Sequence, residues 1–137
     1  LQAMNTGHDG SMSTGHANSP KDMLSRLETM ILMGIEMPLS AIRAQIASGI
    51  DIIVYLGRLR DKSRKVIEID EVQGYFSGEI VLNKLYEFVE YGETDGKICG
   101  QLEQTDNQLI HTDKMIKSGQ IKGGENDLQN NKKGYNI

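Results

Sequence analysis

Residues 6–26 read TGHDGSMSTGHANSPKDMLSR, a polar stretch that runs directly into the start of a helix. It holds two of the three histidines of the chain, together with glycines and short hydroxyl and amide side chains. If residues 11–18 are extended, Thr14, His16 and Asn18 share one face, because successive side chains of a strand alternate between faces. Such a face suits a phosphate oxygen, a water or a substrate hydroxyl. The alternative is that these side chains only satisfy one another and cap the helix that follows.

The stretch ends in a helix start signal. Ser19 is a good N-cap, Pro20 occupies the first helical position, and Asp22 completes an approximate capping box. We therefore expect a helix over residues 20–33 with Gly34 as its C-terminal cap. Its inward stripe at helical spacing consists of Met23, Leu24, Leu27, Met30 and Ile31.

A second helix is expected to begin at Pro38 and to end near Gly49. We expect its exposed side to carry Arg43 and Gln45. Its inward stripe consists of Leu39, Ile42 and Ile46.

The pattern changes after this helix. The nearly continuous aliphatic run of residues 50–56 predicts a buried strand, and residues 65–72 predict a second strand that pairs with it as a hairpin. Because the connecting turn Asp61-Lys62-Ser63 lacks glycine, we expect a loose loop.

The remaining chain is richer in strand residues. Residues 79–91 predict one strand, or two with a break near residues 83–84, and a helix over residues 83–90 is the main alternative. A turn over residues 93–96 and a short strand over residues 97–103 follow. Residues 107–117 predict a terminal helix with Leu109, Met115 and Ile116 facing inward. Residues 119–137 are rich in Gly, Asn, Lys and Gln and predict a disordered tail.

The length, net charge and cysteine content of the chain limit the class of protein to which it can belong. The 137 residues fit one domain with a modest core. The net charge of -4 argues against non-specific nucleic-acid binding, and no apolar run is long enough for a membrane span. The single Cys99 cannot form an internal disulfide and fits a reducing cytoplasm. Since Leu1 falls in what reads as the last turn of a helix, we expect the chain to be part of a longer protein.

Metal binding and cysteine chemistry are not favoured by the sequence. The histidines and Cys99 do not have the spacing of a zinc motif, and Cys99 shows no local sign of activation. Phosphate binding is favoured instead, because arginines supply forked donors that combine with the Thr-x-His-x-Asn face. Arg26 has the alternative of pairing with Asp22 one turn earlier. The arginines concerned are Arg26, Arg43, Arg58, Arg60 and Arg64.

A long run of residues carries a family resemblance. The string GHDGSMSTGHANSP (residues 7–20), followed by LSRLETM (residues 24–30), resembles the His-box region of secretion ATPases, in particular the CpaF-like ATPases of Tad and type II/IV secretion systems. The similarity covers roughly residues 1–103. It continues through AIRAQIAS (residues 41–48), DIIV (residues 51–54), RLRD (residues 58–61), Arg64 and Glu71-Val72.

The resemblance implies an α/β fold, namely the C-terminal portion of a RecA-like P-loop ATPase core with an antiparallel β extension and a disordered C-terminal tail. Residues 1–50 would form the partial core, residues 51–117 the strand-rich part of the same domain, and residues 118–137 the tail. The family assembles into hexameric rings, peripheral to the cytoplasmic face of the inner membrane, and docks on a platform protein there. It uses ATP and Mg²⁺ to drive pilus assembly or protein export.

The resemblance also implies roles for single residues. His16 corresponds to the His-box histidine near the γ-phosphate, and Thr14 and Asn18 shape the same wall. The five arginines are candidates for nucleotide or inter-subunit contacts. We expect no stable nucleic-acid partner, no transmembrane segment and no resident metal.

The sequence departs from the family at two points. The phosphate-binding loop G-x-x-x-x-G-K-[ST] does not occur in these 137 residues, and Lys62 stands where the family has glycine in its Arg-Asp-Gly-Ser-Arg turn. We therefore expect this chain alone to bind ATP poorly, to hydrolyse none, and to expose strand edges that favour self-association. Two alternatives stay open: a non-catalytic module that docks on a secretion ring or membrane platform, and an ATPase segment of a conjugation system.

Overall fold

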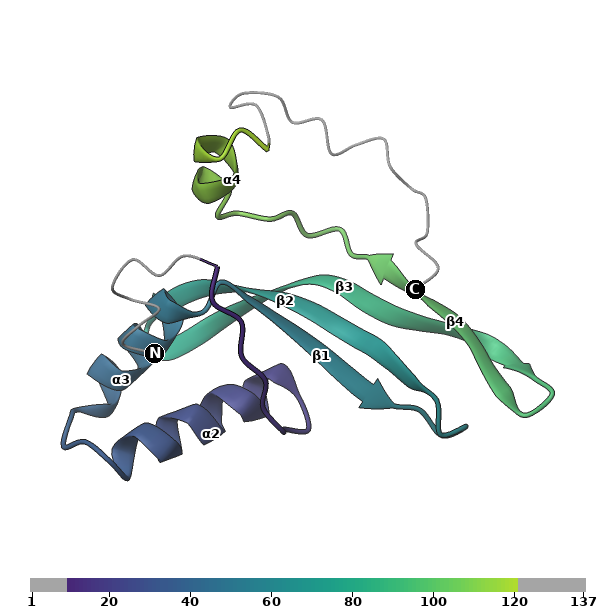
Figure 1. Cartoon of the computed structure of the whole chain (residues 1–137), viewed down its shortest axis with the longest axis horizontal. Helices are drawn as coiled ribbons and strands as arrows, with labels where there is room; N and C mark the ends of the chain where they lie inside the picture. Colours follow the sequence, from purple (N-terminus) through teal and green to yellow (C-terminus); the bar gives the residue numbers. More distant parts are fainter. Residues whose placement is uncertain (1–9, 121–137) are drawn as a thin grey trace.

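A four-stranded antiparallel sheet is the centre of the structure, a computed structural model that describes residues 10–120. The strands β1 (Ile52–Arg58), β2 (Arg64–Phe76), β3 (Glu79–Thr94) and β4 (Lys97–Gln104) neighbour one another in chain order. Helices α2 (Pro20–Leu32) and α3 (Leu39–Gly49) lie on one side of the sheet, and the short helix α4 (Asp113–Lys117) lies on the other (Figure 1). The fold is therefore mixed α/β, as predicted.

The core lies between the two helices and the sheet. Leu24 of α2 and Ile42 and Ile46 of α3 are buried against one another, and the partly buried Ile53 and Leu82 pack on them from the sheet. Both helices begin and end close to their predicted limits, because the N-cap and the apolar stripe are local signals.

Three predictions about side chains of α3 are wrong. Leu39 is exposed, whereas Arg43 and Gln45, expected on the solvent side, are half-buried. Arg43 turns inward because its guanidinium donates to the Glu28 carboxylate of α2 and to the carbonyl of Gly78 between β2 and β3. This arginine joins both helices to the sheet.

The first hairpin forms as expected, but its first strand is not fully buried. β1 pairs with β2, and the loop between them spans residues 59–63, with Lys62 at φ 69 in the left-handed region that glycine adopts easily. One face of β1 remains open, because none of the elements among residues 10–120 covers it. Its exposed fractions are 43% for Ile52, 49% for Val54 and 65% for Leu56.

β3 is a single long strand, which confirms the one strand predicted over residues 79–91. The two alternatives, a break near residues 83–84 and a helix over residues 83–90, are wrong. Irregular register at two points bends the strand without ending it. The turn into β4 contains Asp95 and Gly96, both with positive φ, as a type I′ hairpin turn requires. The predicted turn over residues 93–96 and the strand after it are thus confirmed.

The predicted terminal helix is mostly wrong. Only Asp113–Lys117 is helical, and Met115 and Ile116 are each 39% exposed where the sequence predicted burial. Residues 105–112, named here the strap, instead run in extended form along the sheet towards α4 (Figure 1). The greater part of the predicted tail, residues 121–137, lies outside the described residues, as do residues 1–9.

Candidate functional site

The polar segment of residues 10–18 is not the strand that the sequence predicted. Residues 11–17 have no regular secondary structure, and none of the strands among residues 10–120 pairs with them. The segment leads into the N-terminus of α2, and its backbone passes close to Met23. A Cβ atom added to Gly15 would lie only 2.5 Å from the Met23 methyl group. Glycine thus permits this close approach of backbone to helix.

The end of the segment caps α2. The Ser19 hydroxyl accepts a hydrogen bond from the Asp22 backbone N–H at 3.0 Å, and the Asp22 carboxylate accepts from the Asn18 N–H at 2.9 Å. The predicted capping box is therefore confirmed, with the carboxylate reaching back one residue further than expected. Two backbone donors at the helix start are satisfied, which fixes the direction in which the chain enters α2.

Thr14, His16 and Asn18 are exposed. Within residues 10–120, the side chains of Thr14 and His16 make no hydrogen bond or ion pair, and Asn18 takes part in capping only through its backbone N–H. The imidazole, the hydroxyl and the amide are consequently free to bind a ligand without breaking a contact of the described fold.

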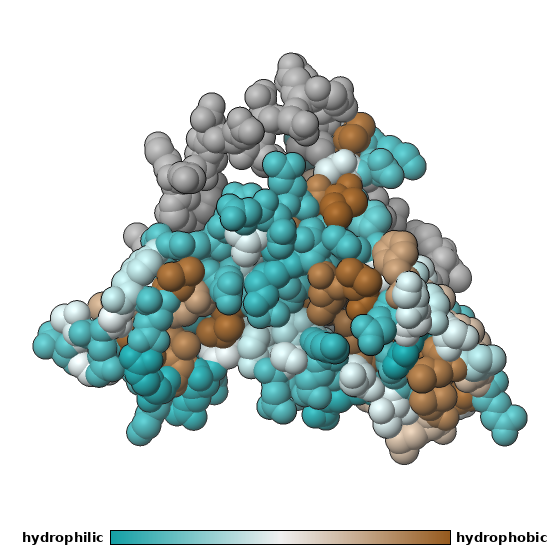
Figure 2. Space-filling view, turned by 180° about the vertical axis from the view of Figure 1, so that it is seen from behind, coloured by the Kyte–Doolittle hydropathy of each residue, from teal (hydrophilic) through white to brown (hydrophobic). Residues whose placement is uncertain are grey.

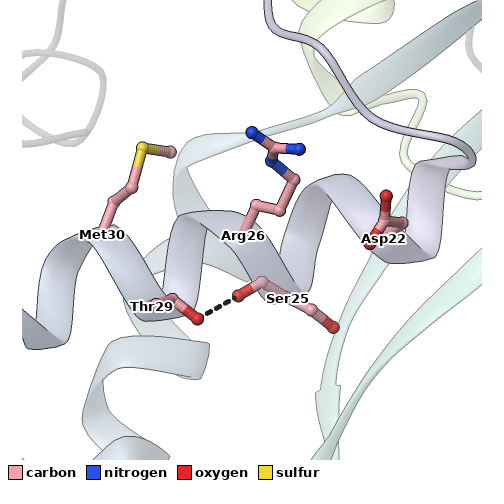
Figure 3. Close-up of a pocket in the computed structure, with 5 residues that line it drawn as sticks. All are labelled: Asp22, Ser25, Arg26, Thr29 and Met30. Atoms are coloured by element: carbon pink, nitrogen blue, oxygen red, sulfur yellow. Dashed lines mark hydrogen bonds between the residues drawn. The ribbon is translucent and has the colours of Figure 1, made fainter.

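An open concavity of about 450 Å³ lies along the solvent side of α2. Figure 3 shows Arg26 and Met30 projecting from the helix beside it, while the Thr29 hydroxyl turns back to donate to the Ser25 carbonyl at 3.0 Å. Arg26 does not pair with Asp22, because the Asp22 carboxylate is engaged at the helix cap. The lining comes from one face of a single helix and consists of Asp22, Ser25, Arg26, Thr29 and Met30.

The five candidate arginines fall into two groups. Arg43 is held by Glu28 at 2.9 Å, a hydrogen bond that raises the pKa of Arg43, and Arg60 pairs with Glu90 and, at 3.4 Å, with Glu93. The other three have no acidic partner among the residues that the structure describes. They are Arg26, Arg58 and Arg64.

A buried carboxylate that sequence reasoning missed organises the other side of the sheet. Glu71 of β2 is 1% exposed, and its oxygens accept from the backbone N–H groups of Ile110 and His111 and from the Asn83 side chain at 2.7 to 3.1 Å. Burial opposes ionisation of Glu71, but the donors from His111, Asn83 and Ile110 outweigh it and hold the pKa below its ordinary value. Glu71 thereby anchors the strap, and its only sequence signal is an acid inside an aliphatic strand.

Asp70 precedes Glu71 on β2, and its side chain points to the face of the sheet that the helices cover. Sequence reasoning did not single out this residue either. It is 2% exposed, and its Oδ2 atom has no hydrogen-bond partner. Burial, followed by hydrogen bonding with Glu68, raises the pKa of Asp70 to about 7, and Lys84 opposes this shift. The sheet therefore carries one buried acid on each face.

Two further observations concern the described residues. Across residues 10–120, no group of three or more His, Cys, Asp or Glu side chains is arranged to hold a metal ion. Within the same range, no helix has the length and apolar character needed to cross a membrane.

Comparison with known families identifies the chain at the level of its family. The family described as "Type II/IV secretion system protein" matches residues 1–122, which include the polar segment, both long helices and the entire sheet. The chain belongs to this family. The resemblance inferred from the His-box string is therefore confirmed at this level.

The curated relatives of this family member carry conjugal transfer names. A protein of Mycobacterium tuberculosis (strain H37Rv) named for conjugal transfer is 33% identical over 69 residues, which are 50% of this chain and 19% of the relative. The conjugal transfer protein TrbB of Rhizobium radiobacter is 33% identical over 75 residues, 55% of this chain and 22% of the relative. The chain thus spans about a fifth of the length of these relatives.

Proposed function

We propose that this chain is the C-terminal part of a CpaF-like secretion ATPase, which couples ATP hydrolysis to pilus assembly or protein export. The observation that carries this proposal is the family match over residues 1–122. It includes the whole TGHANSP string of residues 14–20, in which the resemblance places the His box. The intact protein would act as a hexameric ring, peripheral to the inner membrane on its cytoplasmic side and docked on a platform protein.

In this function His16 lies near the γ-phosphate of ATP, and Thr14 and Asn18 form the same wall. Their exposure and their lack of side-chain partners within residues 10–120 support this role, since each can donate to a phosphate oxygen. These residues fit one side of a triphosphate only, because the lysine and backbone amides of a phosphate-binding loop are not in this sequence. Bound Mg²⁺ would neutralise charge that develops on the phosphates.

The open face of β1 supports a RecA-like core around this chain. The aliphatic residues of β1 suit a strand that is buried on both faces, yet Ile52, Val54 and Leu56 are exposed, and β2 is the one strand among residues 10–120 that pairs with β1. A larger sheet with its own helices would cover these side chains and the outer edge of β1. Strands β2 to β4 would then be the antiparallel extension of that core.

A second candidate is an ATPase segment of a conjugation system. The names of the relatives favour it, because the M. tuberculosis and R. radiobacter proteins are both named for conjugal transfer. The two candidates share the ATP site and differ in the cargo that the machine moves. Replacing His16 by Ala in the producing cell would abolish DNA transfer in one case, and export or piliation in the other.

The experiment that tests ATP hydrolysis compares this chain with the longer protein proposed to contain it. We expect no phosphate release above buffer from the 137-residue chain, and turnover by the longer protein that falls by at least about a hundredfold with His16→Ala. His111→Ala is the matched control, because His111 lies in the strap, away from the His16 segment, and its ring hydrogen-bonds to the Gln73 carbonyl. Full turnover by the 137-residue chain alone, or by the His16→Ala variant, would refute the proposal.

A further inference from the structure

The tip of the first hairpin carries two arginines side by side. Arg58 ends β1 and Arg64 begins β2, and the two residues are direct partners in the antiparallel ladder. Opposite residues of such a pair project from the same face, with Cβ atoms about 5 Å apart. Both side chains are exposed. Two like charges in this position repel each other and destabilise the hairpin, so the fold itself gives no reason for the pair.

The acids near this tip are already engaged. Glu90 and Glu93 pair with Arg60. The two oxygens of Asp61 accept from the Ser63 backbone and hydroxyl and from the Ile98 N–H at 2.6 to 2.9 Å. Neither Arg58 nor Arg64 has an acidic partner in the described part of the chain, so two positive charges remain without neutralisation.

The backbone that carries the pair is held in place. The Asp61 carboxylate ties the loop to the first residues of β4, and hydrogen bonding from Ser63, together with that from the Ile98 backbone, lowers the pKa of Asp61 to about 2. The loop is also closed by backbone hydrogen bonds between Leu59 and Ser63 and between Lys62 and Leu59. A rigid base reduces the entropic cost of binding a ligand at the tip.

We propose that Arg58 and Arg64 form a phosphate-binding site at the tip of the β1–β2 hairpin. Two adjacent guanidinium groups carry a charge of about +2, which a phosphate group of about −2 balances and a single carboxylate does not. Each planar guanidinium offers parallel N–H donors that match two phosphate oxygens. Lys62, exposed in the same loop, adds a third cation.

This site differs from the wall proposed around His16. Residues 10–18 lead into α2, whereas the tip lies beyond the far end of β1, where the strand leaves the helix layer (Figure 1). The phosphate can belong to a nucleotide or to a lipid headgroup, and the geometry of the pair suits both. Phosphate binding at this tip does not require ATP hydrolysis, because Arg58 and Arg64 lie outside the His16 segment.

The test titrates the 137-residue chain with inorganic pyrophosphate and follows the arginine side-chain N–H signals by NMR. We expect saturable shifts at Arg58 and Arg64, and binding that is about tenfold weaker in Arg58→Gln and in Arg64→Gln. Arg60→Gln is the matched control from the same loop, since Glu90 and Glu93 already neutralise that side chain. It should change the affinity by less than about twofold.

Two further titrations identify the source of the phosphate. Tighter binding of ATP than of pyrophosphate, lost in Arg58→Gln, indicates a nucleotide, and sedimentation with phosphatidylglycerol but not phosphatidylcholine vesicles, lost in the same variant, indicates a headgroup. If no probe binds in a way that depends on Arg58 and Arg64, or if Arg60→Gln weakens binding as much as Arg58→Gln, the site does not exist. Circular dichroism spectra of the variants show whether each one is folded.

Discussion

Polar residues of the sheet and its first hairpin loop differ from those of residues 10–18 in the contacts that they make. Glu71 in the sheet and Asp61 in the β1–β2 loop accept hydrogen bonds from residues more than 30 positions away in sequence, and these contacts join the strap and the loop to the strands. In the segment of residues 10–18, Thr14 and His16 make no side-chain contact of this kind within the described residues. The difference separates polar side chains that hold the fold from polar side chains that are available to a ligand.

Polar side chains are common on the face of the molecule that Figure 2 shows. Hydrophilic side chains dominate the face shown there, and hydrophobic side chains form separate patches among them. A polar residue on the surface is therefore unremarkable by itself, and its partners decide whether it is structural.

Replacing Glu71 by Ala should destabilise the fold most. The substitution leaves the N–H groups of Ile110 and His111 and the Asn83 amide without their acceptor, which is expected to lower the free energy of unfolding by about 3 kcal/mol. Urea denaturation measures this change. Glu87→Ala is the control, because Glu87 is exposed and its contact with Lys84 at 3.6 Å is weak. Equal losses in the two variants would show that the strap is not anchored by Glu71.

Asp70 should make stability fall as the pH rises. The folded pKa of about 7 lies above the ordinary 3.8, so the folded protein binds this proton more tightly than the unfolded chain does. Stability associated with the proton is present below about pH 4 and is lost as the pH rises through 7. The charged groups that act on Asp70 are Glu68 on the same strand and Lys84 on β3, and Ile53, its partner on β1, is neutral.

Asp70→Asn should remove this loss. At pH 8 we expect the free energy of unfolding of the variant to exceed that of the native chain by about 1 to 3 kcal/mol, and the difference to shrink towards pH 4. Unfolding in urea at several pH values measures it. Asp95→Asn, at the exposed β3–β4 turn, is the control and should follow the native curve. Parallel curves for Asp70→Asn and the native chain would mean that Asp70 is ionised at little cost in the fold.

The parts of the fold that could be predicted are those specified by neighbouring residues. Ser19, Pro20 and Asp22 determine where α2 begins, and Asp95 and Gly96 determine the turn between β3 and β4. The greater part of the strap fell within the helix predicted over residues 107–117, with Leu109, Met115 and Ile116 expected to face inward. Its backbone amides at residues 110 and 111 instead bind Glu71, a contact between residues about 40 positions apart that no local pattern reveals.

The candidate site was predictable in composition and not in conformation. The Thr-x-His-x-Asn spacing and the family string drew attention to three residues that are exposed in the structure, and their role in a site stays a prediction. The predicted strand requires a neighbouring strand, and none among residues 10–120 pairs with the segment. The arginines also show that sequence alone does not reveal which side chains have partners in the fold. Sequence alone offered five equivalent candidates, and only the positions of Glu28, Glu90 and Glu93 in the fold separate the neutralised ones from the rest.

Replacing His16 is expected to change the free energy of unfolding least. The matched comparison is a substitution at the nearby Ser19. Ser19→Ala removes the acceptor of the Asp22 N–H and should lower the free energy of unfolding by about 1 kcal/mol. His16→Ala removes no hydrogen bond or ion pair within the described residues and should change the free energy of unfolding by less than about 0.5 kcal/mol. Thermal unfolding of both variants under one set of conditions compares them. A loss in His16→Ala as large as that in Ser19→Ala would make His16 a structural residue and would remove the reason for regarding its exposed ring as available to phosphate.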